Sequence, residues 1–260
     1  MTPGVSESRA VLVTGASKGI GLGIAQWFAR EGCSLRLAAR SKDLLEHEAA
    51  AIRKSAAVDV QVFALDLSQD AGRKKLTDAC PEVDVLVNNA GDIPAGSLDD
   101  VDDAAWRAGW DLKVFGYVGL TRHYFSKMKA RGRGVVINII GAAGERPMPA
   151  YVAGSMGNAS LMSMTIALGA ASPEHGVRVL GVNPGPVLTD RVVKISRKRA
   201  KAMLGDEERY AELLKKNPFG RPATVDEIAA SVVFLASDLS SYTSGTIVTI
   251  DGGFSKRPAV

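Results

Sequence analysis

Residues 14–21, with the sequence TGASKGIG, place three glycines in a short loop, and this pattern is suited to binding phosphate. Gly15 allows a tight turn, Gly19 lets the backbone approach a phosphate, and Gly21 lets a helix and a strand pack closely. The loop follows an apolar run and precedes a helical pattern, so free N–H groups and a positive dipole end would face a pyrophosphate. We therefore predict a dinucleotide site, with a ligand-free tight turn as the alternative. Its contact residues would be Gly15, Ser17, Lys18, Gly19, Ile20 and Gly21.

The end of the second apolar run decides which dinucleotide would fit. A carboxylate there would hydrogen-bond the ribose 2′-hydroxyl and repel a 2′-phosphate. Residues 38–41 are instead Ala-Ala-Arg-Ser, with no acid. Arg40 can fork onto a phosphate and Lys18 adds a second cation, so NADP(H) is predicted over NAD(H). The alternative is that both are solvated surface cations.

Length and composition limit the classes of protein to consider. The chain has 260 residues, 46% hydrophobic and 23% charged, which suits one α/β domain and excludes disorder, coiled coil and collagen-like sequence. The net charge of +4 is too small to argue for a nucleic-acid partner. No apolar run approaches the roughly 20 residues that span a bilayer. A soluble protein with neither nucleic acid nor membrane as a partner is expected.

Cysteine and histidine usage argues against disulfides and metal sites. Cys33 and Cys80 are far apart and in no CxxC motif, and the three histidines are scattered. Residues 1–9 are polar, with Pro3 and Gly4, and lack the hydrophobic core of a signal peptide. A reducing, cytoplasmic location and no metal are expected.

Short β-branched runs alternate with longer helical patterns along the chain. Most runs are continuously apolar, which is typical of parallel strands covered by helices on both faces. Right-handed crossovers then produce a doubly wound sheet. Residues 1–260 are thus predicted to form a single-domain α/β Rossmann fold with a parallel sheet of about seven strands. Strands are expected at 10–14, 34–39, 60–65, 83–87, 134–140, 177–182 and 246–250, and helices at 20–31, 41–54, 102–130, 150–171 and 225–237.

Residues 188–220 interrupt this alternation between the sixth strand and the next helix. Insertions after the C-terminal ends of strands lie over the ligand crevice in such folds, so a substrate lid is predicted. Its cations can attract an anionic substrate, the alternative being an amphipathic helix with a hydrated outer face. No aromatic residues interleave with them, which argues against nucleic acid. The cations are Arg191, Lys194, Arg197, Lys198, Arg199 and Lys201.

Five further motifs stand beside the glycine loop. They are Asp66-Leu67, Asn88-Asn89-Ala90-Gly91, Tyr151, the NPGPVLT of residues 183–189 and the ending YTSG-x₄-IDGG of residues 242–253. With these motifs, residues 10–253 resemble the short-chain dehydrogenase/reductase family. The resemblance implies an NAD(P)-dependent oxidoreductase that interconverts a small-molecule carbonyl and alcohol. It also implies a homo-oligomer, a homotetramer or homodimer, with interfaces on the helix from Asp102, on the helix of Tyr151 and at residues 252–260.

The resemblance implies cofactor contacts beyond the glycine loop. Asp66 and Leu67 would hold the adenine. The remaining contacts would line the cofactor after the fourth strand or flank the nicotinamide. Each motif has a purely structural alternative: a helix cap for Asp66, bonds between strands for the asparagines, and a simple turn for the Pro-Gly pair. These remaining residues are Asn89, Ala90, Gly91, Pro184, Gly185, Val187 and Thr189.

The catalytic set of the family is Ser–Tyr–Lys supported by Asn. In it the tyrosine is the general acid or base, the serine polarises the carbonyl, the lysine holds the ribose and lowers the tyrosine pKa, and the asparagine shapes a proton path. Tyr151 matches the tyrosine, but Ser155 stands four residues on, where lysine is expected. No hydroxyl residue lies between Ile139 and Ala150, and Gly141 is ten positions from Tyr151 rather than the usual dozen or so.

Lys113 stands at the asparagine position, seven residues after Trp106. A lysine stem from the long helix can deliver its ammonium into the space left beside Ser155. Lys113 is therefore predicted to lower the pKa of Tyr151, which is about 10 in a free phenol, and to bind ribose. The alternative is that Lys113 points to solvent or pairs with Asp111.

The missing serine has several candidate replacements. Ser155 shares a helical face with Tyr151 and can touch substrate or ribose. Asn158 shares the same face two turns on. Gly141 can open the pocket to a water or a substrate donor, and the loop residues Glu145 and Arg146 can approach the carbonyl.

Two functions follow from these residues. In the first, the chain is an NADP(H)-dependent oxidoreductase whose modified site uses Tyr151, Lys113 and Ser155. In the second, it is an NADP(H)-binding sensor or partner protein with little catalytic power, because fold alone does not imply chemistry. Tyr151 and the cofactor-facing residues favour the enzyme.

Overall fold

Seven parallel strands form one sheet in the order β3-β2-β1-β4-β5-β6-β7. The computed structural model describes residues 9–257, so the N-terminal eight residues and the last three of the predicted C-terminal interface segment lie outside the described part. The strands are β1 (Ala10–Thr14), β2 (Ser34–Ala39), β3 (Val60–Ala64), β4 (Val85–Asn88), β5 (Gly134–Ile139), β6 (Val177–Pro184) and β7 (Ile247–Ile250). The predicted seven-stranded doubly wound fold is confirmed.

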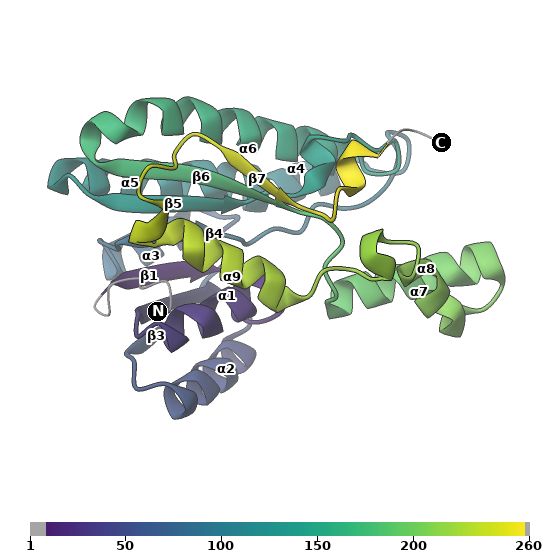
Figure 1. Ribbon diagram of the computed structural model, residues 1–260, viewed down its shortest axis with the longest axis horizontal. Helices are drawn as coiled ribbons and strands as arrows, with labels where there is room; N and C mark the ends of the chain where they lie inside the picture. Colours follow the sequence, from purple (N-terminus) through teal and green to yellow (C-terminus); the bar gives the residue numbers. More distant parts are fainter. Residues whose placement is uncertain (1–8, 258–260) are drawn as a thin grey trace.

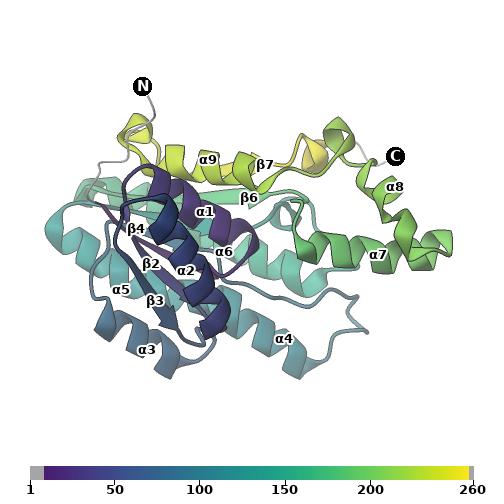
Figure 2. The same cartoon turned by 90° about the horizontal axis from the view of Figure 1, so that it is seen from below.

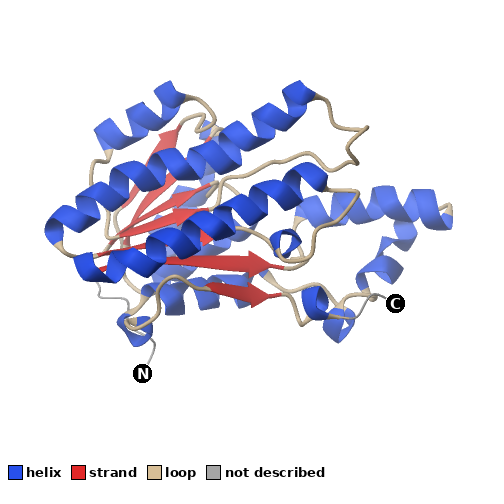
Figure 3. Ribbon diagram, turned by 90° about the horizontal axis from the view of Figure 1, so that it is seen from above, coloured by secondary structure: helices blue, strands red, loops and turns tan. Residues whose placement is uncertain are grey.

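Helices cover both faces of this sheet, as Figures 1 and 2 show: α1, α2 and α9 lie on one face, and α5 and α6 lie on the other. Figure 3 shows the helices of the second layer lying over the sheet. The helices are α1 (Gly19–Arg30), α2 (Lys42–Ser55), α3 (Asp70–Ala79), α4 (Asp103–Trp110), α5 (Gly116–Arg131), α6 (Val152–Ala171), α7 (Asp190–Leu204), α8 (Tyr210–Leu214) and α9 (Val225–Ala236).

The central strands are apolar on both faces because each face packs against a different core. In β1, Val11 and Val13 join the core beneath α1 and α9, where they meet Ile24 and Phe28. Leu12 points the other way and packs with Leu86. All of these side chains are fully buried, as expected for a parallel sheet between two helical layers.

Sequence patterns missed two features of the helices. The predicted helix at 102–130 is divided by a π-helical turn, η1 (Asp111–Phe115), between α4 and α5. Helix α3 was not predicted at all, because only Gly72 and Leu76 of its residues are buried and its apolar periodicity is weak. Within the described residues no helix has the length and apolar character needed to cross a membrane.

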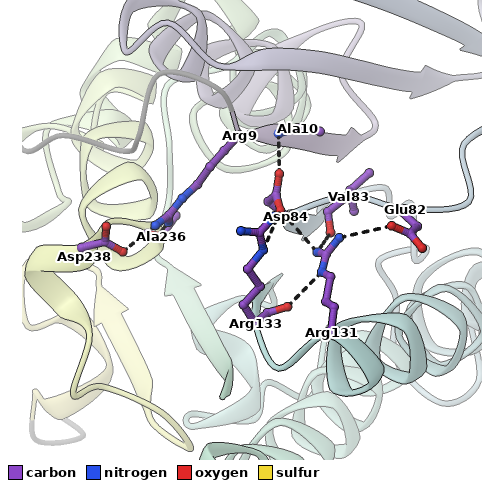
Figure 4. Close-up of polar contacts among 9 residues, drawn as sticks. All are labelled: Arg9, Ala10, Glu82, Val83, Asp84, Arg131, Arg133, Ala236 and Asp238. Carbon is purple, nitrogen blue, oxygen red and sulfur yellow. Dashed lines mark hydrogen bonds and ion pairs between the residues drawn. The ribbon is translucent and has the colours of Figure 1, made fainter. Parts of the chain in front are cut away.

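The edge of the sheet where the strands begin is closed by charged side chains (Figure 4). Asp84 Oδ2 accepts from the Ala10 amide at 2.9 Å, and Asp84 Oδ1 lies 3.5 Å from the Arg131 guanidinium and 3.9 Å from that of Arg133. Arg131 also donates to the Val83 carbonyl. These contacts tie together β1, β4, α5 and β5 where the strands begin.

Buried polar side chains link the neighbouring strands β4 and β5 near their C-terminal ends. Asn88 Nδ2 donates to Asn138 Oδ1 at 2.9 Å and to Thr121 Oγ1 at 3.0 Å. Asn138 Nδ2 in turn donates to Thr165 Oγ1 at 2.9 Å. For Asn88 the purely structural alternative, a bond between strands, is therefore what the structure contains. The network spans β4, β5, α5 and α6, which are the elements that carry the candidate site.

We expect Asn138→Ala to lower the free energy of unfolding by about 2–4 kcal/mol, because it removes one buried hydrogen bond from Asn88 and another from Thr165. Thr121→Val removes only one of the two bonds of Asn88 and should cost about 1 kcal/mol. Urea denaturation at one fixed protein concentration measures both. A loss below about 1 kcal/mol in Asn138→Ala would show that the network adds little to stability.

Candidate active site

The glycine loop between β1 and α1 has the geometry of a phosphate cradle. Gly15 and Gly19 adopt φ values of +65° and +58°, a region that favours glycine. The Gly15 amide donates to the Ala38 carbonyl at 2.7 Å, which ties the loop to the end of β2. Lys18 precedes α1 without a capping side-chain bond, so the first amides of α1 remain available to an anion.

Hydrogen bonds of Thr14 and Asn89 hold the glycine loop in place. Thr14 Oγ1 accepts from the amides of Asn89 and Ala90 at 2.9 and 3.0 Å. Asn89 Nδ2 donates to the Thr14 and Gly15 carbonyls at 2.9 and 3.3 Å. A Cβ at Gly21 would lie 2.4 Å from Asn89 Nδ2, so glycine is required there for the side chain of Asn89 to fit. Asn89 therefore supports the glycine loop.

Two cations lie exposed at the end of β2 and in the glycine loop. Among the described residues neither Lys18 nor Arg40 has a carboxylate partner, whereas many other arginines do. Burial opposes ionisation of Asp66, but hydrogen bonds from Ser68 and the charge of Arg40 outweigh it and hold the pKa of Asp66 below its usual value. Leu67 is buried in the core, so Asp66 is the exposed member of that motif.

The segment after β6 passes close to the glycine loop. The Gly185 amide donates to the Ile250 carbonyl at 3.0 Å, and Val187 forms a bridge with Ala223. Thr189 Oγ1 accepts from the Val192 amide at 3.4 Å and caps α7. The Thr189 methyl is 3.5 Å from where a Cβ on Gly19 would be, so α7 begins beside the phosphate cradle.

Tyr151 lies at the start of α6 with its ring over Gly154. A Cβ at Gly154 would be 1.9 Å from Tyr151 Cζ, so a side chain at 154 and this ring cannot coexist. Gly154 lies thirteen positions after Gly141, which matches the dozen or so of the family better than the ten positions to Tyr151. Burial raises the pKa of Tyr151, the charge of Arg191 lowers it, and that of Asp92 raises it. The net result is an upward shift, contrary to the lowering expected from the sequence.

Lys113 points into the protein and not to solvent, and the ion pairs of the described residues include none between Lys113 and Asp111. Its Nζ donates to the Ile140 carbonyl at 2.5 Å, and its stem lies against Gly91, where a Cβ would be 2.8 Å from Lys113 Cδ. Burial lowers the pKa of Lys113 to about 7, and the positive charge of Arg191 adds to the effect. An ammonium of this kind changes its charge near neutral pH.

The three consecutive carbonyls after Asn138 each receive one side-chain donor. Tyr117 Oη donates to Ile139 at 3.0 Å, Lys113 donates to Ile140, and Asn158 Nδ2 donates to Gly141 at 3.3 Å. A Cβ at Gly141 would be 3.0 Å from Asn158 Nδ2, so Asn158 occupies part of the space that a side chain at 141 would need.

Ser155 is committed to a structural contact. Its Oγ accepts from the Met148 amide at 3.1 Å, and only 4% of the residue is exposed. The hydroxyl therefore closes the loop before α6 and offers little surface to a ligand, in contrast to the role expected from its helical face.

Glu145 and Arg146 turn away from the site. Glu145 accepts from Asn183 Nδ2 at 2.8 Å and from Lys256 Nζ at 2.6 Å. Arg146 donates to the Phe254 carbonyl at 2.8 Å and stacks 5.2 Å from the centre of its ring. Both side chains thus hold the C-terminal segment and are not candidates for polarising a carbonyl.

Arg191 is a site residue that sequence patterns did not single out. From the first turn of α7 its Nη1 reaches Asp92 Oδ1 at 2.9 Å, and its Nη2 reaches the Ile93 carbonyl at 3.2 Å. In the sequence it was one of six cations in a run, with no signal to separate it from the others. In the part of the chain that the structure describes, no group of three His, Cys, Asp or Glu side chains could hold a metal ion.

Comparison with known proteins identifies the family. A family model described as enoyl-(acyl carrier protein) reductase matches residues 15–255. The NADP-dependent (R)-specific alcohol dehydrogenase of Lentilactobacillus kefiri is 33% identical, over 96% of this chain and 98% of its own. Galactitol 2-dehydrogenase (L-tagatose-forming) of Cereibacter sphaeroides is 32% identical, over 95% of each.

A solved structure agrees with these relatives. The L-sorbose reductase of Gluconobacter frateurii, complexed with NADPH and L-sorbose, has a TM-score of 0.90 and 30% identity, and the match covers 99% of this chain and 100% of the other. With the glycine loop, the seven-stranded sheet and matches along almost the whole length, this chain belongs to the short-chain dehydrogenase/reductase family of oxidoreductases.

Proposed function

We propose that this protein is an NADP(H)-dependent oxidoreductase that interconverts a carbonyl and an alcohol, with Tyr151 as the acid–base group of a rearranged site. The observation that carries the proposal is the ring of Tyr151 lying over Gly154. If Gly154 is the family's tyrosine position, a phenol from one turn earlier fills the volume of the missing side chain. Lys113, whose stem lies against Gly91, then supplies a cation that the residues at 155 and 158 do not.

The residues of the cleft fit a nicotinamide dinucleotide. The glycine loop and the free amides of α1 would hold the pyrophosphate, Asp66 the adenine, and residues 184–189 the nicotinamide end. Lys18 and Arg40 would bind a 2′-phosphate. The bound dinucleotide supplies the hydride. Relatives named as NADP-dependent or complexed with NADPH support this choice of cofactor.

In this proposal Lys113 donates a hydrogen bond to the substrate oxygen and Tyr151 donates the proton, in place of the family's serine, tyrosine and lysine. An ammonium has three donors, and Lys113 uses one on the Ile140 carbonyl, which leaves others for the substrate oxygen. The raised pKa of Tyr151 keeps its phenol protonated at neutral pH, so it is ready to donate a proton as a carbonyl is reduced. This arrangement favours reduction near neutral pH. In this proposal Ser155, which accepts from the Met148 amide and is 4% exposed, has a structural role.

The proposal extends to a homo-oligomer and to the lid. Phe115, Met156 and Ile166 are about half exposed, at 52%, 51% and 48%, on the helical layer formed by η1 and α6. Large apolar side chains gathered on one layer suit burial against a second copy, in a dimer or tetramer. Residues 188–220, which contain α7 and α8, would act as the substrate lid over the cleft that Thr189 borders.

Replacing the cation at the end of β2 should reverse the cofactor preference. We expect Arg40→Ala to weaken NADPH binding by about 10- to 100-fold, because it removes a charged hydrogen-bond donor. Arg40→Asp should in addition strengthen NADH binding, since a carboxylate there suits a ribose hydroxyl. Fluorescence titration measures both affinities, with the exposed neighbour Lys42→Ala as the matched control. Equal affinities of the unchanged protein for NADPH and NADH would contradict the assignment.

The relocated phenol can be tested at two positions. Tyr151→Phe should lower the turnover of a reducible carbonyl by about 10²–10⁴-fold while NADPH still binds. Gly154→Ala should cause a similar loss, because its Cβ displaces the Tyr151 ring. Steady-state kinetics with a carbonyl library measures both. In the Tyr151→Phe background, Gly154→Ala should reduce turnover little further. Full activity in both single variants would show that another group transfers the proton, whereas NADPH binding with no turnover of any carbonyl would favour the sensor function.

The titration of Lys113 predicts how reduction depends on pH. Its ammonium is present below a pKa of about 7 and is lost above it, so kcat/KM for reduction should fall as the pH rises through 7. Tyr151, with its raised pKa, stays protonated over this range, and the charged groups that act on the pair are Arg191 and Asp92. Lys113→Met should remove this limb of the pH profile and cost about 10²–10³-fold in kcat.

Lys127→Met is the control for this prediction, because Lys127 is exposed on α5 in the same helical layer. It should leave the profile and the rate unchanged. A pH profile that keeps its limb near 7 in Lys113→Met would show that another group titrates.

A further inference from the structure

Arg191 connects the lid to the loop after β4. Its guanidinium lies 2.9 Å from Asp92 Oδ1 and 3.2 Å from the Ile93 carbonyl, and its side chain is still 49% exposed. Asp92 is 65% exposed. An ion pair this accessible to solvent contributes only about 0–1 kcal/mol, so the arginine can exchange Asp92 for another anion at little cost.

The loop that receives Arg191 lies against the start of α6. Ile93 Cδ1 is 3.1 Å from where a Cβ on Gly157 would be, and Gly96 forms a backbone bridge with Tyr151. The positive charge of Arg191 acts on both Tyr151 and Lys113. Arg191 therefore acts on both residues of the proposed site, and the loop that it contacts is joined to the start of α6.

The charges in this region are unbalanced in favour of the cations. Arg191 is always charged, and Lys113 adds a second positive charge when it is protonated. Asp92 is the carboxylate whose charge opposes them at Tyr151. A substrate with one negative charge would replace Asp92 on the guanidinium and favour the protonated form of Lys113.

We propose that Arg191 is a substrate-binding residue and that the substrates are carboxylates: oxo acids in the direction of reduction and hydroxy acids in the direction of oxidation. The proposal rests on the proposed function, because it names the substrate class of that same site. A carboxylate is the fitting anion because the guanidinium already holds one from Asp92 and can bind another with two parallel bonds. The substrate carbonyl would then face Tyr151 and Lys113.

The substrate class is tested with acids and their methyl esters, which carry the same carbonyl but differ in charge. Pyruvate, acetoacetate and levulinate place the carboxylate at three distances from the ketone. For the best-fitting length we expect kcat/KM for the acid to exceed that for the ester at least tenfold. Equal rates for acid and ester at all three lengths would overturn the proposal.

Variants of the ion pair separate specific binding from general attraction. Arg191→Met should erase the preference for the acid, and Arg191→Lys should restore part of it, since it keeps the charge but loses the fork. Asp92→Asn should lower KM for the acid and not for the ester, because it frees the guanidinium. Arg197→Met removes the same charge from α7, where Arg197 pairs with Glu208, and should leave the preference unchanged. An acid preference that survives in Arg191→Met would overturn the proposal.

Binding without turnover distinguishes failure of this inference from failure of the proposed function. An oxo acid and NADP⁺ are both oxidised, so calorimetry of their complex with the protein measures binding alone. We expect the acid to bind at least tenfold more tightly than its ester, and this difference to disappear in Arg191→Met. Arg191-dependent binding with no NADPH oxidation would support the carboxylate site and refute the oxidoreductase. Tyr151-dependent reduction of neutral ketones, with no Arg191-dependent binding of acids, would refute the carboxylate site alone.

Discussion

The absence of a side chain at position 154 determines how the active-site end of α6 is built. With the Tyr151 ring 1.9 Å from where a Cβ on Gly154 would stand, any other residue there would force the ring aside. The same relation occurs twice more nearby. Asn158 fits because Gly141 has no side chain, and the stem of Lys113 fits because Gly91 has none. Each glycine leaves room for a side chain from another position, so the replaced residues form one linked arrangement.

The protonation states of Lys113 and Tyr151 favour one direction of the proposed reaction. Lys113 donates to the Ile140 carbonyl, and the charge that acts on it is that of another cation, Arg191. Burial and this repulsion both lower the pKa of Lys113, to about 7. Burial affects the pKa of Tyr151 more than the charge of Arg191 does, so this pKa rises. A donor ammonium and a protonated phenol coexist only near or below neutral pH. That pair of states suits proton delivery to a carbonyl better than proton removal from an alcohol.

Patterns along the chain predicted the fold well because the sheet is buried on both faces. The bounds of β1 and β2 agree with those expected, and the glycine loop lies where strand, loop and helix predicted it. Helix α3 escaped prediction because it buries so little that its sequence is mostly polar. The π-helical turn at 111–115 was also missed, since local propensity does not distinguish it from the α-helix on either side. For the site, the ten-position gap before Tyr151 was the one sign in the sequence that this tyrosine departs from the family's spacing, and the structure adds that its ring lies over Gly154.

A run of cationic residues in a sequence does not tell which of them contact other parts of the protein, and the cations of α7 are an example. Arg197 pairs with Glu208, and it lines a shallow pocket on α7 with Lys194, Lys198 and Lys201. Arg191, in the first turn, reaches the loop after β4, and its charge acts on Tyr151 and Lys113. An amphipathic helix with a hydrated face therefore describes most of the run, while one arginine contacts a distant loop. Helical periodicity assigns residues to faces, but only the loop after β4 decides which cation has a partner across the cleft.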